Sequence, residues 1–257
     1  MREFFDGVRL FGRGMRLVAR SPRFIALGIV PVILSLILYA GLFALLVYFF
    51  GDLVRLATWY AQDWSSAFWR ESVEAATGVA VAGAAVLLAI PTFTAVTLAI
   101  GDPFYEKISE SIEDKLGGVP DAVDWPWWRS LLRGIADSAR LLLLTLLVAI
   151  PLFLIGIIPV VGQVIAVILG AMAGGWFLAV ELVGIPFYRR GLRLSDRRRM
   201  LRGRRKTTVG FGVAVFLCFL IPFGTILLMP AAVAGGTLLT RRVFGLPASE
   251  KELPSPH

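Results

Sequence analysis

The stretch LLLLTLLVAIPLFLIGIIPVVGQVIAVILGAMAGGWFLAV, residues 141–180, contains no Asp, Glu, Lys or Arg. Three further stretches without these residues cover 24–51, 75–101 and 207–240. About 20 apolar residues in one helix span a bilayer, because a helix satisfies its own backbone hydrogen bonds where water is absent. The four stretches therefore predict an all-α integral membrane protein.

The composition of the 257 residues supports this fold class. Hydrophobic residues make up 57% of the chain and charged residues 17%, against roughly 45–50% and about 25% in a soluble domain. This excess of apolar side chains argues against a soluble enzyme. With Cys218 as the one cysteine and His257 as the one histidine, we expect no intramolecular disulfide, no metal site and no cofactor, and no pair of residues suggests catalysis.

Prolines and glycines divide the four stretches into two kinds. The first two predict long transmembrane helices over 24–50 and 75–100. The other two are interrupted, at Pro159 and Gly162 and at Pro222 and Gly224, and predict helical hairpins over 141–187 and 207–240. Residues 210–221, before the second break, cover only about 18 Å as a helix, less than the roughly 30 Å hydrocarbon core. We therefore expect the second hairpin to be re-entrant, inside one membrane domain over 1–242 with a flexible tail over 243–257.

Two more helices are predicted outside the apolar stretches. Residues 1–20 form an amphipathic helix, which lies either at the lipid headgroups or against the cytoplasmic side of the protein itself; the sequence leaves both open. Asp102-Pro103 begins an acidic helix, or extends the second transmembrane helix, and Gly117-Gly118 ends it. In the amphipathic helix over 1–20, the apolar face is formed by Phe4, Val8, Phe11, Met15 and Val18.

The distribution of basic residues predicts the orientation. Residues 188–206 hold ten Lys or Arg and one acid, residues 1–23 hold six Arg, and residues 52–74 hold two basic residues. Cytoplasmic segments carry the excess of Lys and Arg, so both termini are expected in the cytoplasm. Because the basic segment lies between two membrane stretches, anionic lipid headgroups are favoured over nucleic acid as its partner. The lipid-contacting residues proposed are Arg197, Arg198, Arg199, Arg202, Arg204 and Arg205.

The start of the first long helix is the candidate anion site. Ser21 and Pro22 fit the N-cap and first helical position, and a helix N-terminus has free N–H groups and a partial positive charge that suit an oxyanion. Arg23 adds a planar guanidinium, and Arg20 lies one turn earlier. The alternative is that both arginines only anchor the helix to lipid phosphates.

Few other polar residues lie inside the apolar stretches. Thr92, Thr97 and Gln163 are the candidates for lining a permeation path, unless they only bond neighbouring backbone. The four stretches contain no ionisable Asp, Glu, Lys, Arg or His, which argues against proton coupling. The chain has no GxxxxGK[ST] loop, which argues against ATP as the driving force.

Several segments, taken in order, resemble the CysZ sulfate permease family, which shares a domain with the etoposide-induced membrane proteins. The resemblance covers roughly residues 4–242 and implies an inner-membrane helical protein that assembles as an oligomer and passes sulfate inward for cysteine synthesis. The family's GLR-type motif, associated with sulfate, falls on residues 21–23, where Arg23 matches the arginine and Ser21 and Pro22 differ from its neighbours. The matching segments are SPRF (21–24), GDPFYEKISESIEDKLGG (101–118), IPVVGQV (158–164), VGFG (209–212) and IPFGTILLMPAAVAGGTLL (221–239).

The sequence thus favours a channel-like permease for sulfate or a similar oxyanion, driven neither by ATP nor by protons. The expected partners are the anion, anionic lipids and further copies of the chain. The alternative is a membrane scaffold or lipid-interacting protein of the same domain family that transports nothing.

Overall fold

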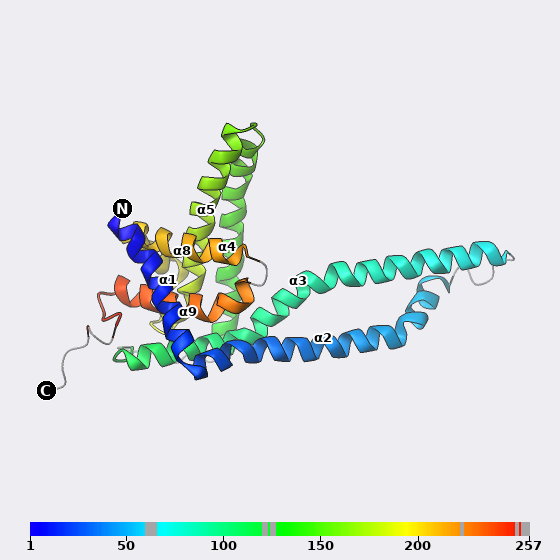
Figure 1. The fold of residues 1–257 in the computed structure, drawn as a ribbon, viewed down its shortest axis with the longest axis horizontal. Coiled ribbons are helices and arrows are strands. Elements are labelled where there is room, and N and C mark those ends of the chain that lie inside the picture. Colours follow the sequence, from blue (N-terminus) through cyan, green and yellow to red (C-terminus); the bar gives the residue numbers. More distant parts are fainter. Residues whose placement is uncertain (60–65, 120–122, 124–126, 222–223, 250–251, 253–257) are drawn as a thin grey trace. The chain divides into compact units, whose positions relative to one another are not determined.

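The computed structural model describes residues 1–59, 66–119, 123, 127–221, 224–249 and 252. All regular structure in these ranges is α-helical, as predicted (Figure 1). The helices are α1 (Arg2–Arg20), α2 (Pro22–Ala57), α3 (Ala67–Lys115), α4 (Trp127–Gly156), α5 (Val161–Leu182), α6 (Gly184–Tyr188), α7 (Leu194–Gly203), α8 (Arg205–Phe219) and α9 (Gly224–Val243).

Five helical segments of the described chain are long and apolar enough to cross a membrane. The helix α8, with 15 residues, reaches about 22 Å and falls short of the bilayer core. The re-entrant character of the second hairpin stays a prediction, and its Pro222 lies outside the described residues. The five segments are Pro22–Ala57, Ala67–Phe93, Ala136–Gly156, Val161–Leu182 and Gly224–Val243.

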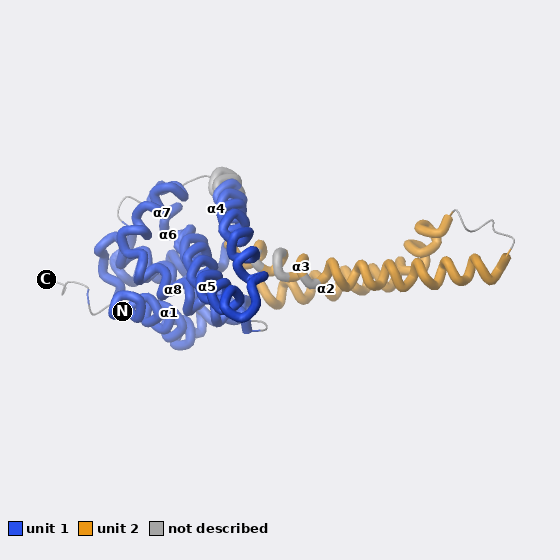
Figure 2. The backbone as a smooth tube through the Cα atoms, turned by 90° about the horizontal axis from the view of Figure 1, so that it is seen from above, with its two compact units in different colours: residues 1–28, 103–257 blue, residues 29–102 orange. Residues whose placement is uncertain are grey.

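The chain forms two compact units (Figure 2). Unit 1 comprises residues 1–28 and 103–257, and unit 2 comprises residues 29–102. The single membrane domain predicted over 1–242 stays a prediction.

Unit 2 consists of the apolar lengths of α2 and α3. Tyr39 on α2 and Phe93 on α3 meet edge to face, with ring centroids 5.0 Å apart. Most large apolar side chains here are exposed, such as Leu45 at 57% and Val86 at 62%. Exposed apolar surface on this scale marks an interaction with lipid or protein, in line with the predicted transmembrane helices over 24–50 and 75–100.

The helix α3 continues without interruption through Asp102-Pro103 to Lys115. Of the two possibilities for the acidic segment, the structure therefore shows an extension of the second long helix. Gly117 and Gly118 follow with φ of 99° and 76°, the left-handed conformation that ends many helices and suits glycine. The predicted end of this helix is confirmed.

In unit 1, α1 packs across α8 and α9 (Figure 1). Backbones touch at the crossings because glycines face them: a Cβ on Gly7 would overlap the Thr207 carbonyl oxygen, and one on Gly14 would lie 2.6 Å from the amide nitrogen of Gly235. The amphipathic helix thus packs on the protein itself, which was one of the two alternatives. Its Phe5 and Met15 remain exposed.

The first predicted hairpin is formed by α4 and α5, which lie side by side (Figure 1). The turn between them covers residues 157–160, next to the predicted break at Pro159, and Val160 there has a positive φ of 62°. The helix α4 begins at Trp127, fourteen residues before the uncharged stretch. Large apolar side chains on both helices, including Phe153 and Val167, are exposed.

Candidate functional site: exposed arginines at the α1–α2 junction and buried ion pairs in unit 1

The three residues predicted to bind an anion lie together at the junction of α1 and α2. Ser21 is extended, with φ −115° and ψ 105°, and α2 begins at Pro22 as predicted. The Ser21 carbonyl oxygen accepts the N–H groups of Phe24 and Ile25 at 3.0 and 3.1 Å. Phe24 is 1% exposed and anchors this first turn, whereas Arg20 and Arg23 are exposed. The junction therefore presents two guanidinium groups beside a helix N-terminus.

The three residues predicted to line a path lie in different units. Thr92 and Thr97 are on α3 in unit 2, and Gln163 is exposed near the start of α5 in unit 1. The Thr92 hydroxyl donates to the Leu88 carbonyl oxygen of its own helix, which is the alternative role proposed for it. Thr97 is buried, and its hydroxyl has no hydrogen-bond partner among the described residues. Their role in permeation stays a prediction.

The basic segment folds into α6, α7 and the start of α8. Arg199, Arg202, Arg204 and Arg205 are exposed and Arg198 is half-buried, but Arg197 is 2% exposed. Arg197 is buried because of helical periodicity. The buried residues Leu194, Arg197 and Leu201 recur at the spacing that places side chains on one face of a helix. The structure thus places the Arg197 guanidinium inside unit 1, away from any lipid headgroup.

Arg197 lies in a polar cluster built from α4, α6 and α7. Its Nη1 donates to the Val180 carbonyl oxygen at 3.0 Å, and its Nη2 is 3.7 Å from Oδ2 of Asp137. The Tyr188 hydroxyl donates to the same Oδ2 at 2.9 Å. Burial raises the pKa of Tyr188, and the bond to Asp137 raises it further. Burial lowers the pKa of Arg197, while Tyr188, Glu181 and Asp137 oppose that change.

A second carboxylate, Glu181, stands beside this cluster. It accepts a hydrogen bond from the Ser138 hydroxyl at 2.9 Å, which ties the end of α5 to α4. Asp137 and Glu181 fall within the candidate spans Ala136–Gly156 and Val161–Leu182, although both lie outside the uncharged stretch 141–180. The sequence showed the acids, and Arg140 lies one turn from Asp137, but the partners that join α4 to α5 and α6 are 43 or more residues away.

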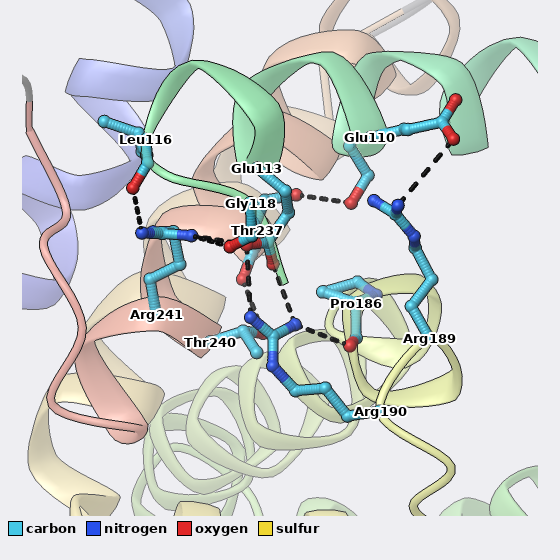
Figure 3. Close-up of polar contacts among 12 residues, drawn as sticks. Glu110, Glu113, Leu116, Gly118, Pro186, Arg189, Arg190, Thr237, Thr240 and Arg241 are labelled. Carbon is cyan, nitrogen blue, oxygen red and sulfur yellow. Dashed lines mark hydrogen bonds and ion pairs between the residues drawn. The ribbon is translucent and has the colours of Figure 1, made fainter. Parts of the chain in front are cut away.

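A buried ion network forms around Glu113 on α3 (Figure 3). Glu113 is 0% exposed, and its oxygens accept both Nη groups of Arg190 at 2.8 and 3.1 Å. Arg241 on α9 donates to the same carboxylate at 2.6 Å. Paired charge-assisted bonds of this kind are the strong ones, so a single carboxylate joins α3, the segment after α6, and α9.

Arg241 is also the residue that caps the C-terminal end of α3. Arg241 also donates to the carbonyl oxygens of Leu116 and Gly118, the latter at 3.0 Å (Figure 3). Its Nε donates to the carbonyl oxygen of Pro247 at 2.6 Å. Carbonyl groups at a helix end have no partner within the helix, and Arg241 supplies one. All three donor nitrogens of Arg241 are therefore used inside the protein, in contrast to the exposed Arg20 and Arg23.

These observations describe the chemistry that the site residues can perform. Within the described part of the chain, no group of three or more His, Cys, Asp or Glu side chains is placed to hold a metal ion. The exposed arginines can bind an anion electrostatically, whereas the buried ones hold helices together. The fold and these charges define a multi-pass helical membrane protein.

Comparison with known proteins places this fold in a family. The family described as Sulfate transporter CysZ/Etoposide-induced protein 2.4 matches residues 10–230, and the chain belongs to it. The resemblance found in the sequence motifs is thereby confirmed.

The chain is similar to proteins named Sulfate transporter CysZ in two Pseudomonas species. It is 31% identical over 247 residues to one from Pseudomonas fluorescens, covering 93% of this chain and 94% of the relative. It is 30% identical over 243 residues to one from Pseudomonas aeruginosa, covering 93% and 96%. A second Pseudomonas fluorescens protein is 36% identical over 163 residues, which cover 61% of this chain and 65% of the relative.

Proposed function

We propose that this protein is a permease for sulfate, or for a similar oxyanion, which passes the ion through a membrane without ATP and without proton coupling. Membership of a family whose curated relatives are named sulfate transporters supports this most strongly. The exposed Arg20 and Arg23 at the start of α2 add a local reason, because guanidinium groups match the geometry of tetrahedral oxyanions.

In this proposal the α1–α2 junction attracts and holds the anion. Arg23 donates two parallel N–H bonds to two sulfate oxygens, Arg20 raises the local positive potential, and the first N–H groups of α2 complete the shell. The arginines lie at the end of the apolar helix, where water remains, so binding stays weak enough for release. The protein lies in the inner membrane with both termini in the cytoplasm and assembles as an oligomer, whose neighbouring copies cover part of the exposed apolar surface.

The test is uptake of radiolabelled sulfate into proteoliposomes. We expect flux above that of empty vesicles, and a fall of at least about tenfold for Arg23→Ala, because the variant loses both N–H bonds to the anion. Arg2→Ala is the matched control, because Arg2 is also an exposed arginine but lies at the opposite end of α1 from the junction. Flux equal to that of empty vesicles, or equal flux in the two variants, would contradict the proposal.

The exposed arginines of α7 and α8 favour a second role, contact with anionic lipid. Arg199, Arg202, Arg204 and Arg205 are exposed, and each basic residue near an anionic surface contributes about 1 kcal/mol. Replacing all four by Gln is expected to weaken binding to phosphatidylglycerol vesicles by orders of magnitude. The buried Arg197 is not mutated in this variant. Equal lipid binding by the four-residue variant would rule this role out.

A further inference from the structure

The segment after α9 borders a small polar cavity in unit 1 that is open to the surface. Its volume is ≈ 310 Å³, and its lining includes Arg204, Arg242 and Glu252 together with the backbone of residues 245–247. Arg204 comes from the junction of α7 and α8, and Arg242 from the last turn of α9. Two arginines from separate helices therefore face one space far along the chain from the α1–α2 junction.

A carboxylate of the chain itself already occupies this space. One oxygen of Glu252 is 3.8 Å from Nη1 of Arg242, and the other accepts the backbone N–H of Ala248 at 2.9 Å. Ala248 is 2% exposed, so its N–H needs an acceptor whenever Glu252 leaves. The cavity thus offers two guanidinium groups to an anion, and Glu252 stands in for that anion.

The surrounding backbone adds to the positive potential. Arg204 is the N-cap residue of α8 and makes no side-chain cap bond, and it lies at the positive end of the dipole of this 15-residue helix. The negative end of α9 is offset by Arg241 and Arg242 in its last turn. Arg241 is already engaged with Glu113, which leaves Arg242 and Arg204 for a ligand.

The contact with Glu252 is weak enough to be exchanged. The side chains of Arg242 and Glu252 are 39% and 38% exposed, and ion pairs at such sites contribute little. A sulfate or phosphate ion has more acceptor oxygens and more charge than a carboxylate, and its bonds to two arginines are stronger.

We propose that the Arg204–Arg242 cavity is a second oxyanion-binding site, in which Glu252 of the C-terminal segment competes with a tetrahedral anion. Occupation by the anion releases Glu252 from Arg242 and Ala248, so the C-terminal segment reports the anion concentration on its side of the membrane. This inference rests on the cavity and its contacts and not on transport by the α1–α2 junction.

The test measures sulfate binding to the full chain in neutral detergent by titration calorimetry, with Arg23→Ala present throughout so that the junction does not contribute. We expect saturable binding that weakens more than about tenfold when Arg204 and Arg242 are both changed to Ala. Glu252→Gln is expected to strengthen binding by about threefold to tenfold, because it removes the internal competitor. Arg9→Ala with Arg16→Ala, two exposed arginines of α1 that do not line the cavity, is the matched control and leaves the affinity unchanged.

Two results would overturn the proposal: equal affinity with and without Arg204 and Arg242, or equal affinity with Gln at position 252. The source of the anion is decided in lipid nanodiscs. If phosphatidylglycerol weakens sulfate binding relative to phosphatidylcholine, a lipid phosphate shares the cavity; if it does not, the site takes the soluble ion. Sulfate flux through the Arg23→Ala variant is measured separately, so failure of the transport proposal and failure of this one are distinguishable.

Discussion

Unit 2 and helix α9 of unit 1 differ in how they place their apolar side chains, whereas α4 and α5 of unit 1 expose theirs as unit 2 does. In the most apolar 18-residue window of Ala67–Phe93, 0% of residues are buried, whereas in that of Gly224–Val243 67% are. Unit 2 exposes Leu45 and Val86, while unit 1 buries Glu113 and Arg241. The more hydrophobic helices are thus the less buried ones, whereas in a water-soluble protein the hydrophobic residues are the more buried ones.

This difference indicates the environment in which each region is stable, either lipid or the interior of the protein itself. The helices of unit 2 satisfy their backbone internally and leave apolar side chains for lipid or neighbouring copies to cover. Unit 1 has a core of its own, in which helices meet at glycines and are joined by buried ion pairs. Lipid is therefore expected to decide the stability of unit 2 and of the exposed hairpin α4–α5, and internal packing that of α1, α8 and α9 in unit 1.

The strongest test removes the central charge of unit 1. Glu113→Ala leaves Arg190 and Arg241 buried without their shared carboxylate, which costs about 3–5 kcal/mol. The free energy of unfolding in detergent, from denaturant titration, measures this. Glu110→Ala is the control, since Glu110 is partly exposed and its partners Lys107 and Arg189 lie near the surface; a loss under about 1 kcal/mol is expected. Equal losses would mean that the network around Glu113 does not hold unit 1 together.

The next test concerns the exposed surface of unit 2. Leu45→Lys places a charge on an apolar helix face, and insertion into a membrane should become less favourable by about 2.5–3.5 kcal/mol. The inserted fraction, from carbonate extraction and protease protection, is the readout, with Leu45→Ala as the control that stays inserted. A protein that inserts normally with Lys at position 45 would show that this face does not meet lipid.

A smaller effect is expected at the helix crossings of unit 1. Gly7→Ala drives a methyl group into the Thr207 carbonyl oxygen and should cost about 1–3 kcal/mol through overpacking. Gly12→Ala on the same helix meets no atom within 4 Å and should stabilise the protein by about 0.5–1 kcal/mol, because alanine favours a helix. Denaturant titration separates the two, and a stabilising Gly7→Ala would argue against close packing of α1 on α8.

The smallest effect is a pH dependence in the Arg197 cluster. The pKa of Tyr188 is raised in the folded protein, mainly by burial, so its contribution to stability is present below about pH 10 and is lost as the pH rises further, where the unfolded tyrosine ionises first. Tyr188→Phe should reduce the loss of stability between about pH 8 and about pH 11. Tyr48→Phe, at an exposed position, should leave it unchanged; an identical pH profile for Tyr188→Phe and wild type would contradict the assignment.

The helices themselves were largely predictable from the sequence. The start of α2 at Pro22, the turn near Pro159 and the end of α3 at Gly117 each follow from one residue with restricted or permissive backbone geometry. Which arginines of α7 face the protein interior was harder to predict, because a run of arginines gives no contrast in hydrophobicity between the faces of the helix. Only the buried neighbours Leu194 and Leu201 identify the inward face on which Arg197 lies.

The candidate site was predictable only in part, because sequence signals act over short distances along the chain. Arg20, Ser21 and Arg23 are consecutive or nearly so, and a local motif brought them together. The Glu113 network joins residues 77 and 128 positions apart, and the Arg204–Arg242 cavity joins α7, α8 and the segment after α9. Such sets leave no period or spacing in the sequence.

The amino-acid sequence alone determined that this chain is helical and enters a membrane, because long uncharged apolar stretches have no other stable arrangement in water or lipid. It also determined the start of α2, the turn between α4 and α5 and the end of α3, since those signals act within a few residues. Tertiary structure decided which arginines are exposed and which form ion pairs inside unit 1, and it decided that glycines of α1 are contact points. The physical reason is that burial and ion pairing depend on groups far apart in the chain, which meet only when the helices pack.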